Sequence, residues 1–213
     1  MNNMGESIVF ATGYPIGFVT INDYEYYSIQ LNDNTYPVNL LCAFVWLEAL
    51  KGGRTKIDVM DNVIEELQIK GYELGKHFTL ENLEYGYSNL LSSSLIIEVS
   101  VENMNELLEK YSELKPFRNG FGMGMEFDKI VIHHESQDID VEAIEYYIWQ
   151  LSTGNRNLSV MYEEYKKSFM SKSSEDSKLA ELNEDELENN LKELFVKAFM
   201  SLYKKNLVYI ANI

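Results

Sequence analysis

Residues 38–46 read VNLLCAFVW, and residues 141–149 read VEAIEYYIW. Each stretch ends in one of the chain's two tryptophans, Trp46 and Trp149, which stand 103 positions apart. Both stretches carry apolar residues at helical spacing. Self-similarity at a fixed offset bears on the whole fold, so this pairing predicts an internal duplication of one structural unit.

The similarity extends beyond the two tryptophans in both directions. At the same offset a Gly-Phe pair recurs, which aligns Gly17 with Gly120. We expect these two glycines, like Trp46 and Trp149, to occupy equivalent structural positions. The last segments of the copies, NLLSSSLIIEV and SLYKKNLVYIA, also correspond after an insertion in the second copy.

Each copy is expected to contain strands, then three helices, then a closing strand. In the first copy, residues 17–21 and 24–31 alternate in polarity and are rich in β-branched and aromatic residues, which is typical of strands. Apolar residues at helical spacing predict the three helices, and these are followed by a strand; the segments are 37–53, 55–72, 79–94 and 94–100. The second copy repeats this order, with a strand at 127–134, helices at 140–155, 158–170 and 183–205, and a strand at 207–212.

Local signals set the expected ends of the helices in the first copy. Proline suits the first turn of a helix, so we expect Pro37 to begin the first helix and Gly52 to follow its last turn. Thr79 is expected to cap the amino end of the third helix.

Strand, three helices and strand is the element order of a winged helix. The predicted fold class is therefore α+β, an internal duplication of two winged-helix-like units joined by a helical connector. The first unit is expected to span residues 1–103, the connector 104–118 and the second unit 119–213, with a flexible insertion near 171–183. A generic α+β duplication is the alternative.

Composition and charge restrict the class of partner. The chain has 213 residues, of which 46 % are hydrophobic, and this suits one large or two small domains. Its formal net charge of −16 opposes binding to nucleic-acid phosphates and to anionic membranes. The acidity favours a basic protein partner, mimicry of DNA, or solubility alone. The chain lacks a signal-peptide pattern and a membrane-spanning run, so we expect a cytoplasmic protein of bacterial or phage composition.

The third helix of each copy is the segment that a DNA-binding winged helix would place in the major groove. Residues 79–94 contain no Lys or Arg, and residues 183–205 open with four acids before Lys192. The cluster KGGRTK at 51–56 is small and typical of an exposed turn. A winged-helix transcriptional regulator is therefore the alternative, and nucleic acid is a disfavoured ligand.

No pattern in the sequence predicts a catalytic, cofactor or metal site. His133 and His134 are adjacent on an expected strand, so their rings would point to opposite faces. The glycine-rich segment 119–127 lacks a following helix and a GK[ST] motif, so it does not resemble a phosphate loop. Cys42, in an apolar run, is expected to be buried. We therefore expect a protein that is not an enzyme; a deep pocket lined by convergent polar groups would favour an enzyme instead.

The remaining use of the predicted architecture is to bind another protein. The hypothesis is a non-enzymatic interaction module (an adaptor, inhibitor or immunity-type protein) whose partner is a protein, a basic one among the possibilities. Tyr24, Tyr26 and Tyr27 are the candidate interaction surface, because tyrosine offers large contact area together with a hydroxyl. The alternative for these tyrosines is that some face the core and others cover it. The sequence leaves the oligomeric state open.

Overall fold

The computed structural model describes residues 7–31, 33–100, 103, 105–126, 129–173 and 184–210. The fold is mixed α+β, with seven helices and small antiparallel sheets among these residues. The chain divides into two compact units, residues 1–102 with residues 210–213, and residues 103–209. Each unit is described by itself.

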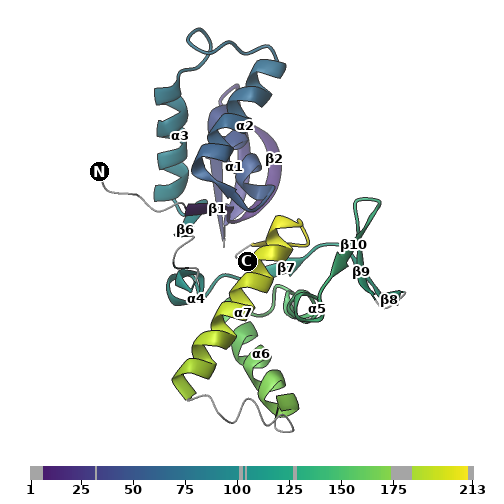
Figure 1. Ribbon diagram of the computed structural model, residues 1–213. Helices are drawn as coiled ribbons and strands as arrows, with labels where there is room; N and C mark the ends of the chain where they lie inside the picture. The colour runs from purple at the N-terminus through teal and green to yellow at the C-terminus, as the bar shows by residue number, and fades with distance from the viewer. Residues whose placement is uncertain are drawn as a thin grey trace. The chain divides into compact units, whose positions relative to one another are not determined.

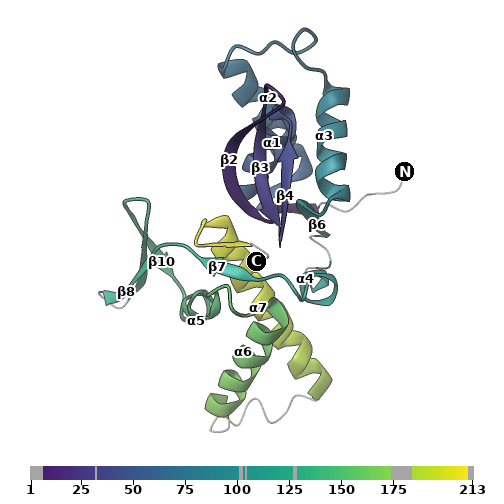
Figure 2. The same cartoon turned by 180° about the vertical axis from the view of Figure 1, so that it is seen from behind.

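The first unit contains a three-stranded meander, three helices and a second small sheet. In chain order its elements are β1 (Ser7–Ala11), β2 (Tyr14–Ile21), β3 (Tyr24–Leu31), β4 (Asn34–Val38), α1 (Leu40–Leu50), β5 (Arg54–Thr55), α2 (Lys56–Ile69), α3 (Leu80–Ser92) and β6 (Ile96–Ser100). The meander has the order β2-β3-β4, and the second sheet has the order β5-β1-β6. The helices α1 and α2 cover one face of the meander, in front of it in Figure 1 and behind it in Figure 2.

Capping residues set the helix starts, and one of them corrects the expectation from the sequence. The Asn39 side chain accepts a hydrogen bond from the Cys42 N–H at 2.9 Å, so α1 begins at Leu40. Pro37 does not start this helix; it lies in β4 opposite Ser28, because an asparagine cap follows it closely and the chain before that cap is extended. Thr79 caps α3, accepting from the Asn82 N–H at 3.1 Å.

The second unit has a similar order of elements. They are α4 (Glu106–Lys110), β7 (Pro116–Arg118), β8 (Phe121–Glu126), β9 (Lys129–His134), β10 (Gln137–Val141), α5 (Ala143–Leu151), α6 (Leu158–Ser173), α7 (Glu184–Lys204) and β11 (Val208–Ile210). The meander has the order β10-β9-β8, and β7 pairs with β11.

The segment expected to be a helical connector, residues 104–118, is helical only in the five residues of α4. Its end forms the strand β7, because Pro116 cannot continue a helix and Phe117 bridges to Thr153. The expected flexible insertion near 171–183 begins in the last turn of α6, and its residues 174–183 lie outside the described part of the chain.

The two tryptophans make the same contact in their respective units. Trp46 is fully buried, and its indole N–H donates to the Thr12 carbonyl at 2.9 Å. Trp149 is 4 % exposed, and its indole N–H donates to the Asn119 carbonyl at 2.8 Å. The two acceptor residues also make equivalent backbone hydrogen bonds. The Thr12 N–H donates to the Leu95 carbonyl at 2.9 Å, and the Asn119 N–H donates to the Leu207 carbonyl at 2.7 Å. Each tryptophan therefore ties the helix that follows the meander, α1 or α5, to the chain that enters the meander.

The register of the two meanders differs from the ungapped alignment. Gly17 and Gly124 each follow a bulge in the first strand, whereas Gly13 and Gly120 both precede that strand with φ of 91° and 80°. The counterpart of Gly120 is therefore Gly13, and Gly17 corresponds to Gly124. The hairpin β8–β9 is shorter than β2–β3, so the offset of 103 positions holds from β3 through the helix that carries Trp46 but not in the strand before it.

Candidate interaction surface

Strands β2 and β3 expose a run of large apolar and aromatic side chains. Between positions 14 and 24, the exposed ones are Tyr14, Ile16, Phe18, Ile21 and Tyr24. Phe18 pairs with Tyr27 on the inner face of the hairpin, their rings 5.3 Å apart, whereas Ile21 pairs with Tyr24 on the outer face. Exposed apolar side chains gathered on one hairpin mark interaction sites more often than single ones do.

The structure separates the three tyrosines that were predicted to form the interaction surface. Tyr24 is 69 % exposed and lies opposite Ile21 across the hairpin. Tyr26 points to the same face, because alternate residues of a strand do so, and it is half-buried. Tyr27 points to the opposite face, where its ring lies 6.3 Å from that of Trp46 and burial raises its pKa. Tyr24 and Tyr26 thus belong to the outer face, and Tyr27 packs against the core.

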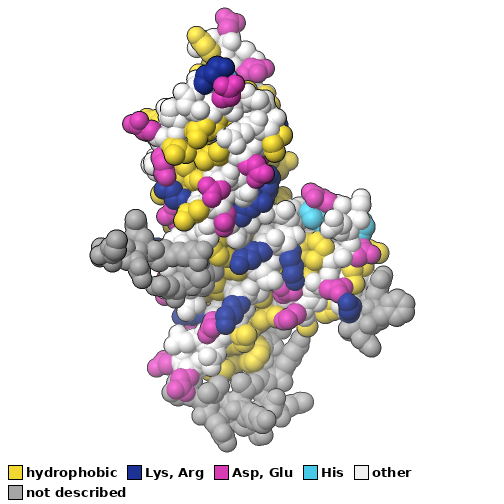
Figure 3. Space-filling model, turned by 45° about the horizontal axis from the view of Figure 1, so that its top comes forward, with side chains coloured by type: hydrophobic (Ala, Val, Ile, Leu, Met, Phe, Trp, Pro, Cys, Tyr) yellow, Lys and Arg dark blue, Asp and Glu magenta, His cyan; other side chains and the backbone are white. Residues whose placement is uncertain are grey.

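The charges of the first meander are all negative. The first fifty residues of the chain contain no Lys, Arg or His. Asp23, Glu25 and Asp33, in and beside the meander's hairpin turns, are exposed. Figure 3 shows the first unit from the side of α1 and α2, where hydrophobic, acidic and basic side chains are interspersed. All charged side chains of the meander that carries the exposed apolar residues are therefore acidic.

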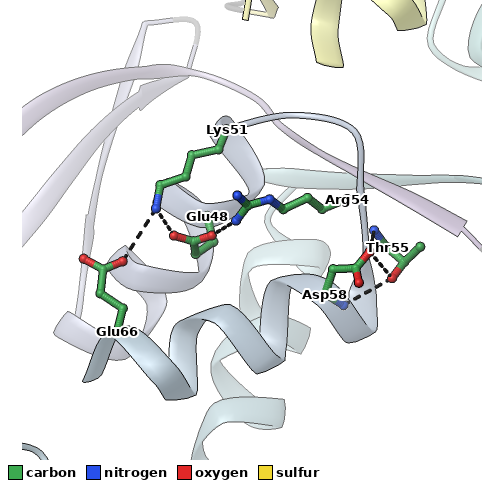
Figure 4. A network of polar contacts seen from close by, with 6 residues as sticks. All are labelled: Glu48, Lys51, Arg54, Thr55, Asp58 and Glu66. Atoms are coloured by element: carbon green, nitrogen blue, oxygen red, sulfur yellow. Dashed lines mark hydrogen bonds and ion pairs between the residues drawn. The ribbon is translucent and has the colours of Figure 1, made fainter. Parts of the chain in front are cut away.

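The basic cluster at residues 51–56 is neutralised within the unit. Glu48, on the last turn of α1, is 1 % exposed, and its carboxylate accepts from both Lys51 and Arg54 (Figure 4). Lys51 lies a further 3.7 Å from Glu66 on α2. A buried carboxylate requires such partners, since an unpaired buried charge is strongly destabilising. The charges of these cations therefore balance acids of the same unit.

The third helices offer little positive charge to a phosphate. Helix α3 has no Lys or Arg, and the neighbouring Lys56 is ion-paired to a glutamate of α3 itself at 2.8 Å. On α7, Lys192 lies 3.3 Å from Glu188 and Lys197 lies 2.6 Å from Glu193. These pairs lie within one helix, so the local surface of α7 is mixed in sign.

The residues with possible chemical roles are dispersed in the described part of the chain. His133 lies 2.7 Å from Asp138, and no group of three or more potential metal ligands occurs among the described residues. The glycine-rich segment forms the strand β8. Cys42 is buried, its thiol lies 3.7 Å from the Gly86 carbonyl, and burial raises its pKa, which opposes thiolate formation.

Two of the hollows in the second unit differ in the character of their walls. One, of about 370 Å³, lies between α5, α6 and α7 and has mainly apolar and aromatic walls, including Ile144, Tyr147, Tyr165, Phe169 and Leu194. The other, of about 770 Å³, gathers polar groups beside the start of α5.

The polar groups of the larger hollow bond to one another. Glu145 is buried, and both of its carboxylate oxygens lie 2.9 Å from the ammonium of Lys205. Burial raises the pKa of Glu145, but hydrogen bonds from Ser201, the Glu142 N–H and Lys205 outweigh burial and hold that pKa below its usual value. Lys129 is ion-paired to Asp140 at the rim. This arrangement stabilises the start of α5 and keeps the Glu145 carboxylate ionised.

None of the described helices is long and apolar enough to cross a membrane. No family model matches the chain, and no curated protein matches it. Two similar solved structures are those of PKMT2 from Rickettsia typhi. The one in complex with AdoHcy has a TM-score of 0.36 at 12 % identity, and the other has a TM-score of 0.33 at 14 % identity. Each match covers 95 % of this chain and 42 % of the solved chain, so this chain spans less than half of their length.

This comparison corrects the expectation that the protein is not an enzyme. The solved structures are methyltransferase structures, one of them holding AdoHcy, and the assignment as non-enzymatic is therefore withdrawn. At these TM-scores and identities the likeness assigns no reaction to this chain.

Proposed function

We propose that this chain is a protein-interaction module, of the adaptor or inhibitor kind, built from two winged-helix-like units. The observation that carries the proposal is the exposed apolar and aromatic surface of the hairpin β2–β3. Large rings beside a polar rim are typical of surfaces that bind protein.

The topology of both units supports the winged-helix-like part of the proposal. In the first unit a short strand separates α1 from α2, and β6 follows α3 and pairs with β1. In the second unit Thr153, between α5 and α6, bridges to Phe117 of β7, and β11 follows α7 and pairs with the same strand. The common hydrogen bond of Trp46 and Trp149 supports a duplication.

The charges favour a protein partner over DNA. Phosphate binding depends on Lys and Arg that are free to replace counterions. The third helix of the first unit has no such residue, and the nearby Lys51 and Arg54 are paired with a buried acid. A winged-helix transcriptional regulator is the alternative function; strong retention on heparin that falls steeply with added salt would favour it.

The test is affinity capture from the native host, followed by measurement of the identified partner's affinity. We expect the variant carrying Ile21→Ala and Tyr24→Ala to bind at least about tenfold more weakly, because residues at the centre of an interface carry most of the affinity. Tyr85→Ala is the matched control, since Tyr85 on α3 is 67 % exposed, close to the 69 % of Tyr24. Equal affinity of the unsubstituted chain, the double variant and Tyr85→Ala would show that the interaction surface lies outside this hairpin.

A further inference from the structure

The hollow between α5, α6 and α7 has uncharged walls in a highly charged chain. Charged residues make up 24 % of the sequence, yet none of the nine described residues that line this hollow is Asp, Glu, Lys or Arg. The three helices lie together in the second unit (Figures 1 and 2). The volume of about 370 Å³ falls within the range of pockets that hold small molecules.

Aromatic rings form much of the wall. Tyr165 and Phe169 of α6 lie with their ring centroids 6.3 Å apart, and Tyr146 of α5 stacks on Trp149 at 5.6 Å. Tyr165 is 5 % exposed, and burial raises the pKa of its hydroxyl, which therefore stays protonated and uncharged. Flat faces in an uncharged setting favour a ligand that is itself flat, apolar and neutral.

Three polar groups lie on the same walls and can orient a ligand. They are the Tyr147 hydroxyl, the Gln150 amide and the Ser168 hydroxyl. The Tyr147 hydroxyl lies 3.5 Å from the Glu164 carbonyl, at the long limit of a hydrogen bond, so a ligand acceptor at the usual distance would compete with that carbonyl. A small number of polar groups on apolar walls is typical of small-molecule sites.

The first unit shows that the fold does not require an opening at this place. The α1 positions that correspond to Tyr147 and Gln150 at the offset of 103 are Phe44 and Leu47. Phe44 belongs to the core of the first unit and Leu47 packs against that core, whereas Tyr147 is half-buried and Gln150 is exposed. The same helix face is therefore covered in the first unit and lines a hollow in the second.

We propose that the hollow between α5, α6 and α7 binds a neutral small molecule that carries two or three aromatic rings, since a cavity of about 150 Å³ holds one benzene ring. A charged ligand would lose its hydration there without meeting an opposite charge on the walls. The net charge of −16 further opposes an anion. This site shares no residue with the hairpin β2–β3, so it stands or fails independently of the protein-binding function.

The probe is N-phenyl-1-naphthylamine, a neutral dye whose fluorescence rises in apolar surroundings, titrated against the full chain. Its matched anion is 8-anilino-1-naphthalenesulfonate, which has the same rings and a sulfonate group. We expect saturable binding of the neutral dye and binding of the sulfonate that is at least about tenfold weaker, because no lining residue supplies a cation. The backbone amide signals of α5, α6 and α7 should shift when the neutral dye binds, and those of α1, α2 and α3 should not.

Variants locate the site on the protein. Leu194→Asp should weaken binding of the neutral dye by at least about tenfold, because it places a carboxylate on the apolar wall. Leu194 is 46 % exposed, so this variant is expected to fold, which an unchanged far-ultraviolet circular dichroism spectrum would verify. Val160→Asp is the matched control and should bind as the unsubstituted chain does, since Val160 on α6 is 44 % exposed and does not line the hollow. Ser168→Phe should also weaken binding by at least about tenfold, because its ring would occupy the hollow.

Several outcomes would overturn the proposal. These are absent or non-saturable binding of the neutral dye, equal binding of the sulfonate, and equal weakening by Val160→Asp and Leu194→Asp. Amide shifts confined to α1, α2 and α3, or full affinity of both Leu194→Asp and Ser168→Phe, would place the dye elsewhere. A captured host protein that displaces the dye and is itself weakened by Leu194→Asp would identify an apolar side chain of a partner as the occupant instead.

Discussion

Two buried carboxylates, Glu48 and Glu145, form ion pairs with several of the Lys and Arg residues of this acidic chain. Glu48 engages Lys51 and Arg54, and Glu145 engages Lys205. Both acids are almost completely buried, so each needs its partners to remain ionised. The consequence at the residue scale is that several of the chain's cations serve folding and do not form a positive surface for ligands.

The pH dependence of stability tests the role of Glu145. Its pKa lies below the usual 4.5 in the folded state, so its ionised form stabilises the fold. This contribution is fully present above about pH 4.5 and is lost as the pH falls through the lower folded-state pKa. We expect Glu145→Gln to lower the free energy of unfolding by about 1.5–3 kcal/mol at pH 7.

Urea unfolding of the original chain and of Glu145→Gln at a series of pH values provides the measurement. The difference between the two should shrink toward acid pH. Glu163→Gln, at an exposed helix position, serves as the control and should change stability by no more than about 0.5 kcal/mol. A difference that persists unchanged to pH 2 would show that the carboxylate charge is not what stabilises α5.

At the scale of elements, the meander hairpins illustrate how register controls which side chains are exposed. The bulge before Gly17 in β2 and before Gly124 in β8 re-aims the side chains that follow it. Without a bulge, a shift of one residue would exchange the two faces of the strand. Ile21 and Tyr24 share the outer face because they pair directly across the turn, and the bulge sets which face the residues before Gly17 take.

Glycine substitutions test this register. Gly120 and Gly124 both have positive φ, but a methyl group at Gly120 would lie 2.5 Å from the His133 carbonyl, whereas one at Gly124 would meet nothing within 4 Å. We expect Gly124→Ala to cost about 1–2 kcal/mol through its backbone conformation. Gly120→Ala should cost about 1–3 kcal/mol more, because it adds a clash with the neighbouring strand.

Thermal and urea unfolding of the two alanine variants measure these costs. Gly13 and Gly17 form the equivalent pair in the first unit and should show the same order, since a methyl group at Gly13 would lie 2.8 Å from the Gln30 carbonyl. Equal costs at Gly120 and Gly124 would contradict the hairpin register described above.

At the scale of the whole molecule, two cores hold two compact units. Trp46 and Trp149 each lie in the core of one unit and bond the chain that enters its meander. The chain has no other tryptophan, so the fluorescence of each single-tryptophan protein reports on one unit. The two units can therefore be followed separately within the intact chain.

We expect Trp46→Ala and Trp149→Ala each to cost about 3–5 kcal/mol, because each removes a large buried side chain. Urea unfolding measured by circular dichroism gives the cost, and the fluorescence of the remaining tryptophan shows whether the other unit is affected. Tyr85→Ala, at an exposed position, should be within about 0.5 kcal/mol of the original chain. A near-neutral effect of either substitution would contradict the placement of that tryptophan in a core. A shift in the unfolding transition of the remaining tryptophan would show that the two units unfold together.

Much of the helical structure was predictable from local patterns. The cap at Thr79 and the apolar spacing that ends in Trp46 and Trp149 depend on residues within a turn or two, so periodicity and capping chemistry reveal them. Pro37 was misplaced because proline suits both a helix start and an edge strand, and only pairing with β3 distinguishes these. The match of Gly17 with Gly120 failed because the ungapped comparison could not detect a shorter hairpin.

The amino-acid sequence alone predicts an acidic chain, two tryptophans in related settings, a third helix without cations in the first unit, and a mixed α+β fold. The three-dimensional fold was needed to show that Tyr27 faces the core while Tyr24 faces outward, that Glu48 pairs with Lys51 and Arg54, and that β2 is an edge strand. The difference lies in how far apart along the chain the interacting residues are. Helix periodicity and capping act over three or four residues, whereas strand order, burial and ion pairing between elements depend on which distant segments come together.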